Sequence, residues 1–193
     1  MTVVKTEPST VLLLPGWQNS SPGHWQSRWE NLHGYRRVEQ HDWLQPRRGD
    51  WCARLEEVIL ATPISRGPLT LVAHSLGCLL VAAWAAHSLN THRVRAALLV
   101  APPDTTDPAI ATMLPGWAAS PGSAVLQKLP FNSCVMASRN DPYCPWDQAL
   151  AFAQAWGSSA CIDCGLAGHL NSDSALGDWP QAHALLLDLQ GPA

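Results

Sequence analysis

Short runs of apolar residues recur along this chain and alternate with longer segments in which apolar residues repeat at helical spacing. The short runs predict six strands, at residues 11–14, 36–40, 69–73, 94–100, 132–137 and 160–163. The longer segments predict five helices, at residues 23–32, 50–61, 76–87, 146–156 and 179–189. Strands that alternate with helices are typical of a parallel sheet covered by helices on both faces. We therefore predict an α/β fold in which residues 1–193 form a single domain around six mostly parallel strands.

Composition and charge exclude several classes of protein. Apolar residues make up 47% of the chain and charged residues 14%, a balance that favours a packed core over disorder. The net charge is −3 and the only lysines are Lys5 and Lys128, so no nucleic-acid partner is expected. The longest apolar stretch, near residues 76–86, is too short to cross a bilayer, and residues 1–10 lack the apolar region of a signal peptide. We therefore expect a soluble, cytoplasmic protein with no membrane partner.

The segment Ala73-His74-Ser75-Leu76-Gly77 lies between a predicted buried strand and a predicted buried helix. This is the context of a nucleophile elbow, a sharp strand-to-helix turn that exposes a serine hydroxyl. Small residues two positions before and after the serine let the strand and the helix approach closely. Ala73 stands where glycine is usual, which is a mild departure, and His74 is expected to pack within the turn. The alternative is that Ser75 only caps an ordinary helix.

A serine hydroxyl is a weak nucleophile, so it needs a base and a group that orients the base. In sheets with such an elbow these partners follow the serine in the order acid, then histidine. Asp141 and His169 have this order, and each follows a predicted strand, where open α/β sheets place their sites. Asp141 also has a structural alternative, since Asn-Asp-Pro is a good turn. The combined order nevertheless favours Ser75, Asp141 and His169 as the catalytic residues.

Two backbone N–H groups are candidates for an oxyanion hole. The Leu76 N–H lies at the start of a predicted helix, where free donors and the helix dipole favour negative charge. The second donor of such sites comes from the loop after an earlier strand. Gly16 permits a close turn after the first predicted strand, so we predict the Trp17 N–H as that donor. The alternative is a plain turn with Trp17 in the core.

The chain resembles the retinoblastoma-binding-protein-nine-like, or YdeN-like, serine hydrolases of the α/β-hydrolase superfamily. The matching segments are residues 14–17, the elbow, and the runs Ser-Arg-Asn-Asp-Pro-Tyr (138–143), Gly-His-Leu-Asn (168–171) and Leu-Gly-Asp-Trp-Pro (176–180). They span nearly the whole chain, and the last three are more specific than the elbow. The resemblance implies a compact α/β-hydrolase fold with Ser75, Asp141 and His169 as its triad. It does not fix the substrate.

Residues 102–131 form the longest segment without a predicted strand or long helix. Prolines at positions 102, 103, 108, 115, 121 and 130 exclude one continuous helix. We predict a small lid over Ser75, with Trp17, Trp117 and Tyr143 as substrate-binding residues. The alternative is a segment that only covers the edge of the sheet. A small, partly aromatic pocket should accept small-molecule esters or amides.

Two other functions fit part of the sequence. A protein-binding module could keep this fold while its activity is vestigial, and the sequence does not identify such a partner. The pair Cys161 and Cys164 could bind a metal or take part in redox chemistry. No second pair with metal-like spacing lies nearby, however, and a redox pair usually opens a helix rather than straddling a strand end. We therefore expect reduced thiols, no metal and no cofactor.

Overall fold

The protein is built on one six-stranded sheet in which all neighbouring strands are parallel. In the computed structural model, which describes residues 10–119 and 123–191, the strand order is β2-β1-β3-β4-β5-β6. The strands are β1 (Val11–Leu14), β2 (Arg36–Arg37), β3 (Leu69–His74), β4 (Val94–Val100), β5 (Asn132–Ala137) and β6 (Ala160–Asp163). This confirms the predicted α/β fold with six parallel strands.

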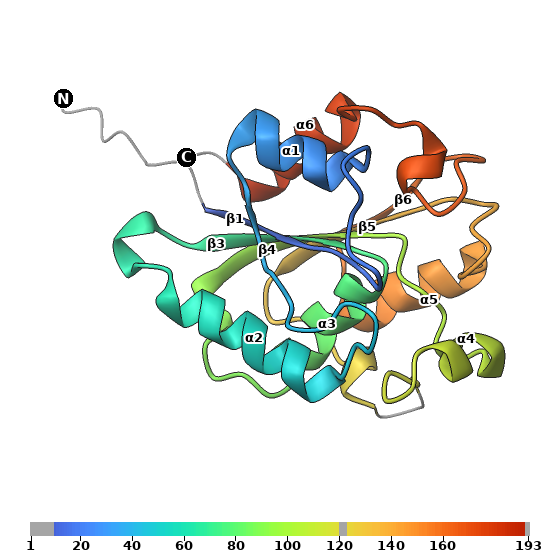
Figure 1. The fold of residues 1–193 in the computed structure, drawn as a ribbon, viewed down its shortest axis with the longest axis horizontal. Coiled ribbons are helices and arrows are strands. Elements are labelled where there is room, and N and C mark those ends of the chain that lie inside the picture. Colours follow the sequence, from blue (N-terminus) through green and yellow to red (C-terminus); the bar gives the residue numbers. More distant parts are fainter. Residues whose placement is uncertain (1–9, 120–122, 192–193) are drawn as a thin grey trace.

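Helices cover both faces of this sheet (Figure 1). They are α1 (Trp25–His33), α2 (Arg48–Ala61), α3 (Leu76–Ala85), α4 (Pro108–Met113), α5 (Trp146–Trp156) and α6 (Pro180–Gln190). Short 3₁₀ turns lie at Ile64–Arg66, Thr91–Arg93, Ala124–Leu126 and Ser172–Ser174. Helices α1 and α6 pack on one face, and α2, α3 and α5 pack on the other. No helix within residues 10–119 and 123–191 is long and apolar enough to span a membrane.

Each central strand is apolar at consecutive positions because both of its faces are buried. In β3, Leu71 and Ala73 point into the core that α2, α3 and α5 cover. Val72, between them, points into the core that α1 and α6 cover, where it shares a cluster with Trp25 and Trp29. Side chains alternate between the two faces of a strand, so a strand covered on both sides needs apolar residues throughout. This is why the central strands could be recognised as short continuous apolar runs.

The strand order places a crevice between β1 and β3. The chain runs from β1 to β2 at one edge of the sheet and returns to β3 on the other side of β1. Where the order reverses in this way, the two loops diverge and leave a binding site at the carboxyl ends of the strands. Trp17 follows β1 and Ser75 follows β3, so the topology alone brings these two predicted site segments together.

The observed elements differ from the predicted ones mainly in β2, α3 and the segment 102–131, and the bounds of β3, α1, α2 and α6 shift by one or two residues. The strand predicted at residues 36–40 is limited to Arg36–Arg37, which pair with Leu12 and Leu13 of β1. Helix α3 ends two residues before the predicted residue 87. The segment 102–131 contains the short helix α4, which the proline content did not suggest. Residues 120–122 of that segment, including Pro121, lie outside the described residues, as do 1–9 and 192–193.

Candidate active site

Ser75 occupies a sharp turn between β3 and α3. Its φ of 54° and ψ of −125° are rare for a residue with a side chain and mark a strained backbone. Two glycines make room for this turn. A Cβ on Gly77 would overlap the carbonyl oxygen of Leu14, and a Cβ on Gly16 would lie 2.7 Å from Ser75 Cβ. The glycines therefore let β1 and its loop pack directly against the serine.

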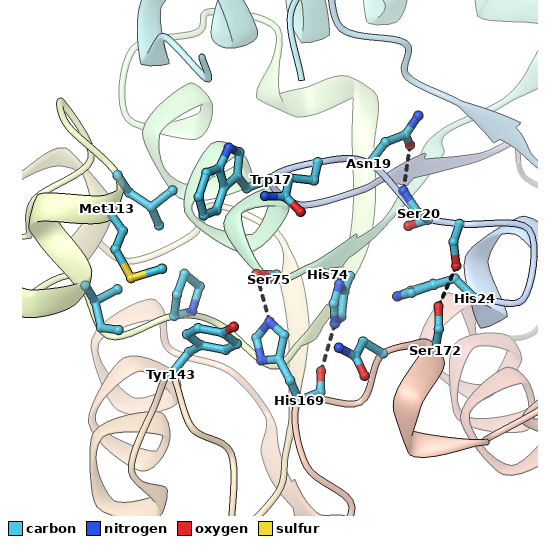
Figure 2. Close-up of a pocket in the computed structure, with 16 residues that line it drawn as sticks. Trp17, Asn19, Ser20, His24, His74, Ser75, Met113, Tyr143, His169 and Ser172 are labelled. Carbon is cyan, nitrogen blue, oxygen red and sulfur yellow. Dashed lines mark hydrogen bonds between the residues drawn. The ribbon is translucent and has the colours of Figure 1, made fainter. Parts of the chain in front are cut away.

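Three side chains form a continuous hydrogen-bonded series. The Ser75 Oγ lies 2.9 Å from His169 Nε2 (Figure 2). On the other side of the ring, His169 Nδ1 lies 2.9 Å from both Oδ1 and Oδ2 of Asp141. A carboxylate only accepts, so Nδ1 carries the imidazole proton and Nε2 is free to accept the Ser75 proton. The structure thus brings together the three residues that the sequence analysis selected.

The loop that carries His169 accepts hydrogen bonds from side chains of two other elements. Gly168 and Leu170, on either side of His169, have positive φ values of 63° and 49°. The His74 Nε2–H donates to the His169 carbonyl oxygen at 2.9 Å. The Trp25 Nε1–H donates to the Leu170 carbonyl oxygen at 2.8 Å. These two hydrogen bonds connect the strained loop after β6 to β3 and α1, and so hold the His169 imidazole in position beside Ser75.

The two backbone donors predicted for an oxyanion hole have no partner among the residues that the structure describes. Leu76 is the first residue of α3, and Trp17 is in the turn after β1. Neither N–H donates a hydrogen bond to another residue within 10–119 and 123–191. Since Gly16 contacts Ser75 from the β1 side, both groups belong to the backbone that borders the serine. Free donors at a helix start are suited to a developing negative charge.

Ser75 and His169 line a pocket of about 550 Å³, a volume within the range of small-molecule sites. Trp17 and Tyr143 are among the residues that line it. The Tyr143 ring packs edge-on against His169 with 4.6 Å between ring centroids. From the segment 102–131, Pro103, Ile110, Met113 and Leu114 form part of the wall.

Trp117 does not take the substrate-binding position that we expected. It is fully buried, and its ring packs edge-on against Trp51 with 5.9 Å between centroids. Its Nε1–H donates to the Pro46 carbonyl oxygen at 2.6 Å. A large apolar ring with a satisfied N–H contributes more by filling the core beneath α4 than by facing water. Trp117 therefore anchors the segment 102–131 rather than lining the pocket.

Two buried histidines lie next to the hydrogen-bonded series of Ser75, His169 and Asp141. The rings of His24 and His74 meet edge-on at 4.7 Å, and the His74 ring lies 4.9 Å from that of His169. Burial lowers the pKa of His24 from 6.5 to about 4, and the nearby Arg37 and His169 contribute in the same direction. Burial likewise lowers the pKa of His74, with His24 and His169 adding to the effect. Both rings are therefore neutral near pH 7.

These lowered pKa values predict a loss of stability in acid. Between pH 6.5 and about 4 the unfolded chain binds the His24 proton and the folded protein does not, so the free energy of unfolding falls as the pH decreases. The His24 contribution lost over this range is about 3 kcal/mol, and His74 acts in the same direction. Urea unfolding at pH 7 and pH 4.5 measures the change.

The matched variant for this prediction is His24→Asn. Asparagine keeps a side-chain acceptor for the Gln26 N–H, which the His24 Nδ1 now accepts at 3.1 Å as the helix cap. It does not titrate, so its stability should depend less on pH than that of the wild type. Equal pH dependence in the two proteins would show that His24 does not carry the effect.

Burial disfavours the thiolate form of the pair Cys161 and Cys164. Cys161 lies on β6 and Cys164 directly follows it, and both are free. Burial is the main cause that raises the pKa of each thiol to about 11. Reactive and metal-binding cysteines need the thiolate, which a raised pKa disfavours. The redox interpretation of Cys161 and Cys164 is therefore not supported.

Comparison with known proteins decides the family. Residues 11–188 match the model of the family described as serine hydrolase. The chain belongs to the serine hydrolase family. Because this match covers nearly the whole chain, the resemblance noted from the sequence is confirmed. No curated protein matches the sequence at a significant level.

Solved structures agree with this assignment to the serine hydrolases. A protein described as a YdeN-like hydrolase from Pectobacterium atrosepticum is 26% identical with a TM-score of 0.78, over 94% of this chain and 90% of that one. The ydeN gene product of B. subtilis is 22% identical with a TM-score of 0.76, over 96% of this chain and all of that one (100%). Est1E from Butyrivibrio proteoclasticus, solved with ferulic acid, shares the fold at 12% identity and a TM-score of 0.66, over 97% of this chain and 88% of that one.

Sequence reasoning missed several residues that line the pocket. These are polar residues of the loop after β1 and the loop after β6: Gln18, Asn19, Ser20, Ser21, His24, Asn171 and Ser172. They lie about 150 residues apart along the chain and meet only in the folded protein, where Ser21 Oγ is 2.6 Å from Ser172 Oγ. No spacing pattern could reveal this contact.

Proposed function

We propose that this serine hydrolase cleaves small ester or amide substrates through an acyl-enzyme, with Ser75 as nucleophile, His169 as base and Asp141 as the residue that orients the base. The observation that carries the proposal is the series Ser75 Oγ, His169 Nε2, His169 Nδ1 and Asp141, with 2.9 Å at each step, opening into the pocket. A hydroxyl hydrogen-bonded to a correctly oriented neutral imidazole is the arrangement that acyl transfer requires.

The proposed reaction has two stages. His169 Nε2 accepts the Ser75 proton while Oγ bonds to the substrate carbonyl carbon, and the Leu76 and Trp17 N–H groups stabilise the resulting oxyanion. His169 then returns the proton to the departing alcohol or amine as the carbonyl re-forms, which leaves Ser75 acylated. A water molecule enters, loses a proton to His169 and attacks the acyl carbon. Ser75 regains its proton and the acid is released.

A binding module with vestigial activity is the alternative, and two features of the site favour the enzyme. A vestigial site has no reason to keep a serine in a strained conformation, which costs about 1–3 kcal/mol. Nor does it need two backbone donors left without partners beside that serine. Strain of this kind persists where surrounding structure maintains it for a functional reason.

The pocket size predicts a preference for short acyl chains. A site of about 550 Å³, walled on one side by Ile110, Met113 and Leu114, holds a compact substrate. Est1E, a structure of the same fold, was solved with ferulic acid, so this fold accommodates small molecules. With p-nitrophenyl esters from two to twelve acyl carbons, we expect kcat/KM to peak below about eight carbons. A maximum at ten carbons or more would contradict the proposed small pocket and its lid.

His74 should act as a positioning residue for the base. Its Nε2–H holds the His169 carbonyl, so losing the donor should let the loop shift and misplace the imidazole. His74→Met and His74→Gln have similar length, but only glutamine can donate from the same place. We expect kcat to fall about 100-fold for His74→Met with little change in KM, since small misplacements of catalytic groups have such effects.

Rescue by His74→Gln separates positioning from general packing. We expect this variant to recover most of the lost kcat although its apolar packing resembles that of His74→Met. If the two variants lose kcat equally, the hydrogen bond to the His169 carbonyl oxygen does not position the base.

A further inference from the structure

The pocket has two walls of opposite chemistry, and Ser75 lies between them. On one side, Met113 and Tyr143 face the serine (Figure 2), and Pro103, Ile110 and Leu114 of the segment 102–131 line the pocket with Met113. On the other side lie His24, Ser172 and further polar residues of the loops after β1 and β6. A substrate whose carbonyl carbon is at Ser75 Oγ must therefore extend one arm toward each wall.

On the polar wall, the amides of Asn19 and Asn171 have their oxygens bonded within the protein and their N–H groups free in the described ranges. Asn171 Oδ1 accepts the Asp173 N–H at 3.0 Å, which identifies the oxygen and leaves the Nδ2 donors without a protein partner within the described ranges. Asn19 Oδ1 accepts from Arg37 and from the Ser20 N–H, at 2.7 and 2.8 Å. These internal contacts determine which way each amide points. The wall therefore offers the amide N–H groups of Asn19 and Asn171 to a ligand.

The His24 ring adds a further unsatisfied donor behind this wall. Because its Nδ1 accepts the Gln26 N–H, its single proton is on Nε2. That N–H is buried and finds no acceptor in the part of the chain that the structure describes. A buried unpaired donor is costly, so this side of the pocket gains from an acceptor oxygen placed near it.

Charge is absent from both walls. None of the described residues that line the pocket is Asp, Glu, Lys or Arg. The nearest cation behind the polar wall, Arg37, is paired with Glu30 at 2.8 Å. The lowered pKa values keep His24 and His74 neutral. An ionic group would lose its hydration in this pocket without gaining a charged partner.

We propose that the substrate is an uncharged ester or amide with a compact apolar group on one side of the scissile carbonyl and an acceptor oxygen, such as an ether or carbonyl, on the other. The inference rests on the proposed hydrolytic function and specifies its substrate class. The apolar arm packs against Ile110 and Met113. The oxygen-bearing arm accepts hydrogen bonds from the wall that contains Asn171.

Three esters that differ by a single CH₂-to-oxygen exchange test this directly. They are butyl pentanoate, 2-methoxyethyl pentanoate with the oxygen in the alcohol, and butyl 3-methoxypropanoate with the oxygen in the acid. Each kcat/KM is divided by the rate constant for hydroxide hydrolysis, which removes differences in intrinsic reactivity. We expect oxygen in one arm to raise kcat/KM about tenfold, the size of one good hydrogen bond, and oxygen in the other arm to lower it.

The opposite signs are the decisive feature, since an enzyme that merely prefers soluble or apolar esters would respond in the same direction to both exchanges. Responses of the same sign, or no response, would overturn the inference while leaving hydrolysis at Ser75 intact. If none of the three esters nor any p-nitrophenyl ester is hydrolysed, the proposed function itself fails and the inference fails with it.

Variants assign the two arms to the two walls. Asn171→Asp keeps the oxygen that caps the Asp173 N–H but replaces the donors by a second acceptor. It should abolish the gain from the favourable oxygen. That gain is measured as the ratio of kcat/KM for the oxygen-bearing ester to kcat/KM for butyl pentanoate, so a general loss of activity in the variant cancels. Met113→Gln should reduce the penalty in the apolar arm, whereas Met113→Leu should retain it. If Asn171→Asp leaves the favourable ratio unchanged, the polar wall does not recognise the oxygen.

Discussion

Replacement of Ser75 by alanine should reduce kcat for p-nitrophenyl acetate by a factor on the order of 10⁶. The variant lacks the hydroxyl that His169 is positioned to deprotonate, so no acyl-enzyme can form. The remaining structure should be unaffected, since alanine keeps the Cβ and, among the residues that the structure describes, the Ser75 hydroxyl bonds only to His169. Steady-state kinetics measure the loss, and circular dichroism with a thermal melt verifies the fold.

A serine outside the site provides the control for this experiment. Ser65 lies in an exposed 3₁₀ turn before β3, and Ser65→Ala should retain wild-type kcat. If Ser75→Ala keeps more than about one part in a thousand of the wild-type rate, after contaminating esterases are excluded, another group performs the attack.

Gly77→Ala should destabilise the protein by roughly 3 kcal/mol despite the better helix propensity of alanine. Alanine normally favours a helix by about 1 kcal/mol over glycine. At this position, however, the added Cβ overlaps the carbonyl oxygen of Leu14 and approaches that of Pro15 at 3.1 Å. Both are backbone atoms of β1 and its loop, which cannot rotate away. Helix α3 must then move outward, and Ser75 with it.

Gly49→Ala is the matched control, because Gly49 is also a helical glycine but is exposed and has no atom within 4 Å of the added Cβ. At Gly49 only the difference in helix propensity acts, so the substitution should stabilise the protein by about 0.5–1 kcal/mol. Urea unfolding of both variants gives the comparison. If Gly77→Ala is as stable as the wild type, α3 does not pack against β1 as closely as the structure indicates.

The sequence predicted those features of the fold that depend on local pattern. Strands β4, β5 and β6 and helix α5 have the predicted bounds, because their apolar runs are bordered by polar or turn residues. Strand β2 is shorter than predicted because only Arg36 and Arg37 find partners on β1. Pairing depends on the neighbouring strand, which a strand's own residues do not specify. Helix α4 did have a local signal, since Asp107 caps it and Pro108 occupies its first turn.

The site also has residues that a local sequence pattern predicts and residues whose place depends on the folded structure. Ser75, Asp141 and His169 could be selected because each follows a strand and their order is characteristic of one reaction. Trp117 was misplaced, since an aromatic residue in a proline-rich segment has the same local pattern whether it faces a pocket or the core. The free donors of the polar wall were not foreseen because they depend on which amide oxygens are already bonded within the protein, as for Asn171. These internal hydrogen bonds form only when the chain folds.

Labelling with a fluorophosphonate probe tests the central claim most directly. The probe phosphonylates a serine, with loss of fluoride, only when a neighbouring base activates the hydroxyl, so it reports the chemistry rather than the fold. Intact-protein mass spectrometry should show one adduct on the wild-type protein, and peptide mapping should place it on Ser75. Ser75→Ala should remain unlabelled, and His169→Ala should label far more slowly. A folded wild-type protein that acquires no adduct, or acquires it on another residue, would contradict the assignment of Ser75 as an activated nucleophile and favour a binding module with vestigial activity.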